Sequence, residues 1–200
     1  MLSIPLRRST LLGQLSKQYF RLPSEAETLR MKETLQEIQA LREAGVIGQS
    51  AIGGAMGATF YLEPISTYDL DIFVLFDSAP LILTLSPIYE FLRSRGHEPE
   101  GDAVNVCGWP VQFLPAEAPL LKEAVEQAVA IDFEGVPTRV MTAEHLAAIA
   151  LQTGRAKDYT RLLAFVESGR LDTTQLTDIL TRHHLFEAWT RFETTYLKPS

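Results

Sequence analysis

One stretch constrains this chain more than any other. Residues 52–76 read IGGAMGATFYLEPISTYDLDIFVLF, in which two aspartates open a long apolar run. Asp69 and Asp71 are two positions apart, so on an extended strand their side chains project from the same face, roughly 7 Å apart along the backbone. The residues that follow, 72–76, are all apolar and suit a strand buried in a sheet. The sequence therefore predicts a buried strand that begins with two carboxylates on one face.

Two carboxylates held this close together repel each other. At an effective dielectric constant near 20, like charges about 6 Å apart repel by on the order of 3 kcal/mol, which is a large share of the stability of a domain. Neither Leu70 nor the apolar run offers a counter-charge. Magnesium is the natural counter-ion, because one or two carboxylates bind it together with substrate phosphates and water. Manganese suits the same oxygen ligands.

A glycine pair precedes the two aspartates. Gly53 and Gly54 follow a short apolar-leaning run, and residues 55–62 have room for one or two turns of helix. Adjacent glycines allow positive φ and let a polyphosphate approach the backbone, and the start of a helix offers free N–H groups. We therefore expect Gly53 and Gly54 to cradle the phosphates of a nucleotide, with Ser66 or Thr67 as an auxiliary donor.

The order of these features resembles the nucleotidyltransferase superfamily that includes DNA polymerase beta. The resemblance lies in the glycine pair followed by STYDLD at residues 66–71, and it covers about residues 45–165. The later stretch 144–158, from EHL to GRAKD, resembles the AbiEii branch, the bacterial abortive-infection and type IV toxin relatives. The resemblance implies a mixed sheet that carries the metal site, a helical C-terminal part, and transfer of a nucleoside monophosphate from NTP to an acceptor.

The resemblance also assigns roles near the start of a C-terminal helix. It implies that Lys157 contacts the phosphates and that Asp158 contributes to the site. Arg155 has two interpretations: it holds phosphates bidentately, or its stem covers the end of the helix. From spacing alone the cluster also fits an exposed, salt-bridged helix face that stabilises the fold little. Both interpretations stay open at this point.

Two positions depart from the family pattern. Many members carry a third carboxylate on the strand that here reads VQFL at residues 111–114, and the matching position is Gln112. An amide binds magnesium more weakly than a carboxylate and cannot act as a general base. Glu63 and Asp77 are the nearest carboxylates in sequence that would replace it. A lysine common in the family is replaced by Ala150.

Composition limits the remaining possibilities. The chain has 200 residues with ordinary hydrophobic and charged fractions, which predicts one domain or two small, closely packed ones. The single cysteine, Cys107, excludes an internal disulfide. A formal charge of −7 argues against a broad basic nucleic-acid surface, although it does not argue against NTP. No apolar run is long enough for a membrane span or a secretory signal, so we expect a cytoplasmic protein.

We expect an α/β (α+β) fold in three parts. The parts are an N-terminal arm at residues 1–23, which is basic and amphipathic, a nucleotidyltransferase-like core at 24–141, and a C-terminal helical part at 142–200. The arm fits either a contact to an acidic partner or RNA, or a helix packed on the domain. Local patterns predict helices over 25–44, 86–96, 119–131, 142–153, 155–167, 172–183 and 185–196, and strands over 69–76, 104–107, 110–114 and 136–141. Ser24 and Glu27 have the spacing of a capping box, Ser86 and Thr142 are the expected N-caps of their helices, and Gly154 is expected to end the helix that Thr142 begins.

Two functions from different classes follow. The first is a metal-dependent nucleotidyltransferase that acts on an RNA acceptor such as tRNA or on a protein, as the toxin of a toxin–antitoxin pair with a cognate antitoxin. Asp69 and Asp71 would hold the metal, and Arg155 and Lys157 would steady the leaving pyrophosphate. The second is a protein that keeps the fold but has lost turnover, and that binds nucleotide or a partner protein. Pyrophosphate release separates the two.

Overall fold

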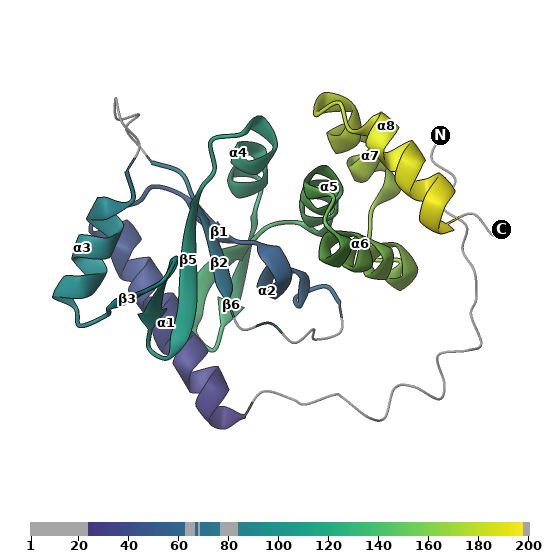
Figure 1. Ribbon diagram of the computed structural model, residues 1–200. Helices are drawn as coiled ribbons and strands as arrows, with labels where there is room; N and C mark the ends of the chain where they lie inside the picture. Colours follow the sequence, from purple (N-terminus) through teal and green to yellow (C-terminus); the bar gives the residue numbers. More distant parts are fainter. Residues whose placement is uncertain (1–23, 63–66, 68, 77–83, 198–200) are drawn as a thin grey trace.

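A seven-stranded mixed sheet forms the centre of the molecule, with helices on both faces, as predicted (Figure 1). The computed structural model describes residues 24–62, 67, 69–76 and 84–197, so the predictions for the N-terminal arm and for Glu63, Ser66 and Asp77 lie outside it. The strand order is β3-β4-β5-β2-β1-β7-β6. The strands are β1 Ser50–Ile52, β2 Leu70–Val74, β3 Pro99–Glu100, β4 Ala103–Val106, β5 Trp109–Pro115, β6 Val129–Phe133 and β7 Val136–Val140. The helices are α1 Glu25–Glu43, α2 Gly54–Ala58, α3 Ser86–Ser94, α4 Pro119–Glu126, α5 Ala143–Thr153, α6 Ala156–Ser168, α7 Thr173–Arg182 and α8 Phe186–Phe192, which continues into a π-helical turn, η1 Glu193–Leu197.

Helix α1 begins with the predicted capping box. The Ser24 hydroxyl accepts a hydrogen bond from the Glu27 amide, and the Glu27 carboxylate accepts one from the Ser24 amide. The apolar stripe of the helix is buried against the sheet, and the Thr34 hydroxyl donates a 2.8 Å hydrogen bond to the Val106 carbonyl on β4. Capping and burial together fix α1 on one face of the sheet, as the apolar spacing predicts.

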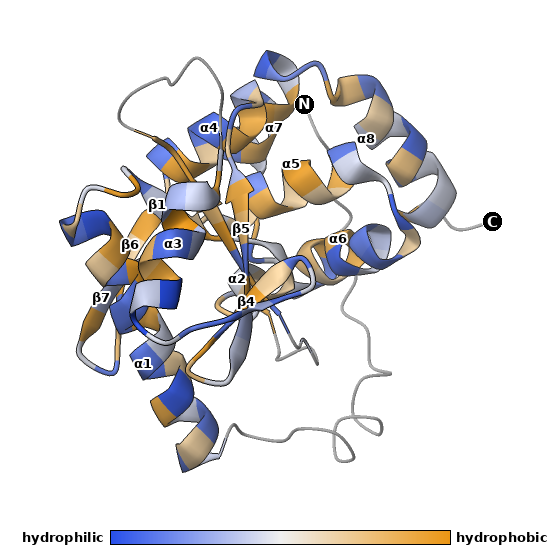
Figure 2. Ribbon diagram, turned by 60° about the vertical axis from the view of Figure 1, so that its left-hand side comes forward, coloured by the Kyte–Doolittle hydropathy of each residue, from blue (hydrophilic) through white to orange (hydrophobic). Residues whose placement is uncertain are grey.

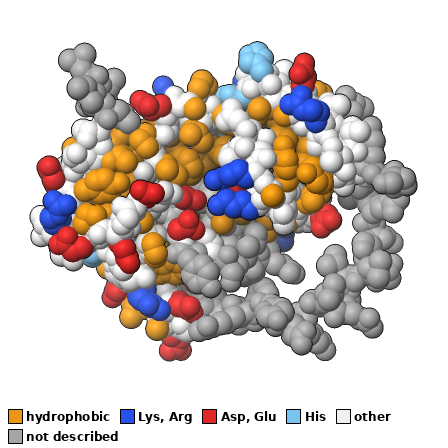
Figure 3. All heavy atoms as spheres, in the orientation of Figure 1, with side chains coloured by type: hydrophobic (Ala, Val, Ile, Leu, Met, Phe, Trp, Pro, Cys, Tyr) orange, Lys and Arg blue, Asp and Glu red, His pale blue; other side chains and the backbone are white. Residues whose placement is uncertain are grey.

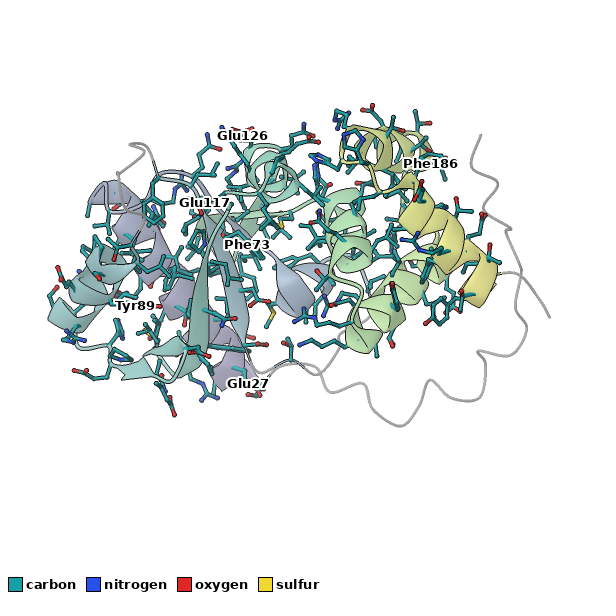
Figure 4. The ribbon with its side chains drawn as sticks, turned by 45° about the horizontal axis from the view of Figure 1, so that its top comes forward. Glu27, Phe73, Tyr89, Glu117, Glu126 and Phe186 are labelled. Carbon is teal, nitrogen blue, oxygen red and sulfur yellow. The ribbon has the colours of Figure 1, made fainter. Side chains whose placement is uncertain are left out.

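Strand β2 is the central strand and separates two hydrophobic cores. Leu70, Ile72 and Val74 are buried in a core shared with α1 and α3. Phe73 points to the opposite face and joins a second core formed with α4, α5 and the C-terminal helices; Figure 4 labels Phe73 near the middle of the molecule. Because side chains alternate along a strand, Asp71 lies on the Phe73 face. The carboxylate pair therefore faces the side of the sheet that the C-terminal helices cover.

Two local predictions were wrong. The helix predicted over 119–131 ends at Glu126, and residues 129–133 form the edge strand β6. The reason is the turn at Glu134 and Gly135, where both residues have positive φ, at 51° and 83°, and return the chain into the β6–β7 hairpin. Ser86 is not the N-cap of α3 but its first residue, and Leu85 occupies the cap position. The Thr84 hydroxyl instead accepts a 3.2 Å hydrogen bond from the Ser86 amide.

The C-terminal helices pack around α5, which is the most apolar helix in the view of Figure 2. Thr142 caps α5 through its hydroxyl, and Gly154 ends it at φ 68°, both as predicted. Trp189 and Phe192 of α8 are buried in the same core as Phe165 of α6. None of the helices in the described part of the chain is both long and apolar enough to cross a membrane.

Glu123 of α4 joins the sheet to the C-terminal helices through three charged or titratable partners. Its Oε1 accepts from Arg182 Nη2 at 2.6 Å and lies 3.2 Å from His145 Nε2, while its Oε2 lies 2.8 Å from His183 Nε2. Burial raises the pKa of Glu123, but the hydrogen bonds from Arg182, His183 and His145 outweigh it and lower the pKa to about 2. Burial lowers the pKa of His145, whose side chain is only 1% exposed.

We expect Glu123→Gln to lower the free energy of unfolding by about 2 kcal/mol at pH 7, because an amide cannot satisfy three donors as a carboxylate does. A carboxylate with a lowered folded-state pKa stabilises the fold above its unfolded pKa, and this contribution is lost as the pH falls from 4.5 toward about 2. Urea unfolding between pH 7 and 3 checks this. The difference between wild type and variant should shrink below pH 4.5; a constant difference would contradict the prediction.

Candidate active site

The two aspartates lie at the entrance to β2 with different surroundings. Asp69 is exposed and accepts a 2.9 Å hydrogen bond from the Thr67 hydroxyl. Asp71 is partly buried and pairs in register with Gln112 on the parallel strand β5. Burial, followed by the neighbouring Asp69 carboxylate, raises the pKa of Asp71. The Asp69 carboxylate therefore adds to the effect of burial in disfavouring the ionised form of Asp71.

Three cations of the C-terminal part act on Asp71. Arg161, Lys157 and Arg155 all lower the pKa of Asp71 through their charges, in that order of strength, although they do not cancel the rise. In the space-filling view of Figure 3, Lys and Arg side chains lie beside acidic side chains near the centre of the face that is shown. Strand β2 and helix α6 thus bring opposite charges, about ninety residues apart in sequence, to one place.

The glycine pair is required by packing against β2. The Gly53 amide donates a 3.0 Å hydrogen bond to the Asp71 carbonyl, and a Cβ on Gly53 would lie 2.5 Å from Cε2 of Phe73. Gly54 has φ +59°, and a Cβ there would overlap Asp71 Oδ2 and lie 2.7 Å from its Cγ. The structure therefore places both glycines directly against the carboxylate strand. Helix α2 then spans five residues.

We expect Gly54→Ala to displace the Asp71 carboxylate and to lower the free energy of unfolding by about 2 kcal/mol, because it adds a steric overlap to backbone strain. Gly101→Ala is a matched control, since Gly101 has φ +64° but open space around its Cβ position. The control should cost only about 1 kcal/mol. Urea unfolding of both variants measures the difference. Equal losses would show that Asp71 does not restrict position 54.

The charged side chains at the start of helix α6 form ion pairs that their spacing alone does not predict. Asp158 is buried, and its Oδ2 accepts from Arg155 Nε at 2.6 Å while its Oδ1 accepts from Arg161 Nη1 at 3.4 Å. The Asp158 side chain is only 2% exposed, so the cluster is not the solvated helix face that one interpretation predicted. Arg155 binds Asp158 rather than simply covering the helix end. Lys157 is exposed and makes no ion pair with any residue in the described ranges.

Arg161 is the site residue that the sequence interpretation missed. It is the cation with the largest effect on Asp71, and its side chain is 14% exposed. The available signal was its spacing from Lys157, four residues along a helix, which places both on one face. Only the folded chain shows that the charges of this face act on Asp71 of β2.

The two departures from the family pattern differ in their surroundings. Gln112 is half-buried, and its amide makes no hydrogen bond within the ranges that the structure describes. Among those residues, no group of three or more His, Cys, Asp or Glu side chains is placed to hold a metal. Asp69 and Asp71 fit a magnesium ion whose other ligands are triphosphate oxygens and water. Ala150, by contrast, is buried in the core of the C-terminal helices, where a lysine would also be buried.

Comparisons with solved structures bear on the fold. The chain is similar to the crystal structure of an antigenic nucleotidyltransferase-like protein from Paracoccidioides brasiliensis, with 14% identity, a TM-score of 0.52, and coverage of 84% of this chain and 95% of the other. The chain has a nucleotidyltransferase-type fold. Two structures of the antibiotic-resistance factor ANT(2'')-Ia each align with a TM-score of 0.48. The solution structure is 13% identical and covers 82% of this chain and 97% of its own. The crystal structure with adenylyl-2''-tobramycin is 11% identical and covers 78% of this chain and 96% of its own. No protein-family model and no curated protein matches the sequence.

Proposed function

We propose that this protein is a magnesium-dependent nucleotidyltransferase that transfers a nucleoside monophosphate from NTP to an acceptor. The observation that carries the proposal is that opposite charges meet at this site: the Asp69 and Asp71 carboxylates lie at the start of β2, and Arg161, Lys157 and Arg155 at the start of α6 lower the pKa of Asp71 through their charges. A metal–triphosphate complex has the matching charges, because the cation binds carboxylates and the phosphates bind Lys and Arg.

Each residue of the site has its own role in this reaction. Bound magnesium would supply charge neutralisation and orientation of the triphosphate for in-line attack. Asp69 and Asp71 hold that ion, and Thr67 orients the Asp69 carboxylate by its hydrogen bond. Arg155 and Lys157 bind the leaving pyrophosphate. Asp158 acts through Arg155 and Arg161 as a positioning residue, because its carboxylate binds both side chains.

The resemblance to AbiEii proteins supports the finer part of the proposal. We assign the protein a role as a toxin whose acceptor is RNA, such as tRNA, or a protein, and whose partner is a cognate antitoxin. Manganese would replace magnesium at the same carboxylates. The net charge of −7 favours an acceptor bound at the local basic cluster of α6 over one bound along a broad surface.

A second function is favoured by one specific observation. Gln112 lies in register beside Asp71, where an amide replaces a base. A protein with this arrangement that binds NTP without turnover would act as a nucleotide-dependent binding partner. Binding with no pyrophosphate release would identify it.

Isothermal titration with each NTP, with and without magnesium, tests the proposal first. We expect magnesium-dependent binding of at least one NTP. Pyrophosphate release with that NTP then tests turnover. A label on the α-phosphorus of the same NTP tests transfer to RNA or protein from cell extract. Absence of binding by any NTP would remove both functions, whereas binding without release in the presence of these acceptors would favour the second.

A further inference from the structure

Among the described residues of the site, the proton-accepting groups are all committed elsewhere. Asp69 and Asp71 bind the metal in the proposed function, and Asp158 is buried between Arg155 and Arg161. Gln112, the next side chain on the Asp71 face of the sheet, is an amide and cannot take a proton. Among these described side chains, therefore, none is free to deprotonate an acceptor.

This arrangement restricts the acceptor. A hydroxyl group must lose its proton as it attacks phosphorus, and enzymes supply a positioned base for that step. A phosphate or carboxylate oxygen is already ionised at neutral pH and needs no base. A site whose described residues include no free base is thus suited to an oxyanion and poorly suited to an alcohol.

Gln112 offers the contact that such an acceptor needs. In the parallel pair β2–β5 it lies directly beside Asp71, about 5 Å away across the sheet. Its amide is half-buried, unpaired among the described residues, and able to donate two hydrogen bonds. A carboxylate at this position would repel an anionic acceptor, whereas the amide donates to it.

We propose that the acceptor is an oxyanion, a phosphate or a carboxylate, held by the Gln112 amide beside the metal site. This inference rests on the proposed function. The acceptor oxygen forms a bond to the α-phosphorus, the bond from that phosphorus to the bridging oxygen breaks, and pyrophosphate leaves with the electron pair. No proton has to be removed from the acceptor. The product is a phosphoanhydride from a phosphate, or an acyl phosphate anhydride from a carboxylate.

The Glu100 carboxylate does not block this site, and the bound metal would offset the charges of Asp69 and Asp71 in the proposed function. The registers of β5–β4 and β4–β3 place Ala103 and then Glu100 on the same face as Gln112. Glu100 is therefore two strands, about 10 Å, from Gln112. It is exposed and accepts a hydrogen bond from Asn105 Nδ2 at 3.3 Å. Salt at physiological strength screens exposed charges at that distance.

The test uses small probes that differ only in the attacking group: methyl phosphate, acetate and ethanol. The protein is first saturated with magnesium and the α,β-methylene analogue of the NTP that it binds. Calorimetry then measures binding of methyl phosphate and of acetate to wild type, Gln112→Glu and Gln175→Glu. Gln175→Glu is the matched control, since Gln175 is exposed on α7. Transfer from the hydrolysable NTP to all three probes is measured in parallel.

We expect at least one of the two anions to bind the wild-type complex and to bind Gln112→Glu about tenfold more weakly, with the control unchanged. Which anion binds identifies the acceptor as a phosphate or a carboxylate. Transfer should favour that anion over ethanol in wild type, and Gln112→Glu should reverse the preference. Absence of anion binding, equal binding by wild type and Gln112→Glu, or a wild-type preference for ethanol would overturn the inference while leaving NTP binding intact. Loss of NTP binding itself would instead remove the proposed function.

Discussion

The double substitution Asp69→Asn, Asp71→Asn is expected to weaken magnesium-dependent NTP binding by roughly 100-fold or more, because it removes both charged ligands of the metal. The free energy of unfolding of the metal-free protein should instead rise. Burial and then the Asp69 carboxylate raise the pKa of Asp71, so the charged pair costs folding free energy at neutral pH. Relief of that repulsion should stabilise the metal-free protein by on the order of 1 kcal/mol.

The sign of this stability change follows from the direction of the pKa shift. An aspartate whose folded-state pKa is raised destabilises the fold when ionised, and the cost disappears as the pH falls through that pKa. The gain from the double variant should therefore be present at pH 7 and vanish in acid. Asp102→Asn, at an exposed turn residue, is the control and should change neither property. Full NTP affinity in the double variant would eliminate the metal site as described.

Asp158→Ala should have the largest effect on stability, about 3 kcal/mol, because it leaves two arginine partners of a buried carboxylate without their counter-charge. Arg161, at 14% exposure, bears most of that cost, since Arg155 is largely solvated. We also expect NTP affinity to fall about tenfold, because Arg155 and Arg161 lose the group that orients them. Urea unfolding and calorimetric NTP titration measure the two effects.

Asp178→Ala provides the comparison for Asp158→Ala. Asp178 also binds an arginine on its own helix, Arg182, but its side chain is 64% exposed. An exposed pair of this kind stabilises a protein by less than about 1 kcal/mol. A similar loss in both variants would show that burial of Asp158 contributes nothing, and unchanged NTP affinity in Asp158→Ala would remove its positioning role.

Much of the fold follows from local patterns that the structure confirms. The capping box at Ser24 and Glu27 starts α1, and Thr142 and Gly154 bound α5. These signals are local, because each depends on hydrogen bonds between residues a few positions apart. The edge strand β6 was missed because residues 129–131 continue an apolar pattern of helical spacing. Its pairing with β7 depends on a turn formed by Glu134, a residue that seldom adopts positive φ.

Local patterns likewise predict one part of the candidate site and not the other. The shared face of Asp69 and Asp71 follows from strand alternation, and the position of Gln112 beside Asp71 agrees with the strand assignment. The partner of this pair could not be predicted from spacing. Arg161 acts on Asp71 only because α5 packs on α2 and α4 and α6 packs on α5, and that tertiary packing leaves no local signature in the sequence. Burial of Asp158 is likewise a property of the assembled core.

The separation of the two charged halves along the chain has a consequence during synthesis. The ribosome completes Asp71 about ninety residues before Arg161, an interval of roughly 5–20 s at ordinary elongation rates. Throughout that time the nascent chain carries the carboxylates without the cations that face them. A chain released before α6 is made would carry the proposed metal-binding carboxylates but not the cations proposed to bind the phosphates. If the protein has the proposed function, products that terminate before α6 should therefore neither bind NTP tightly nor transfer it.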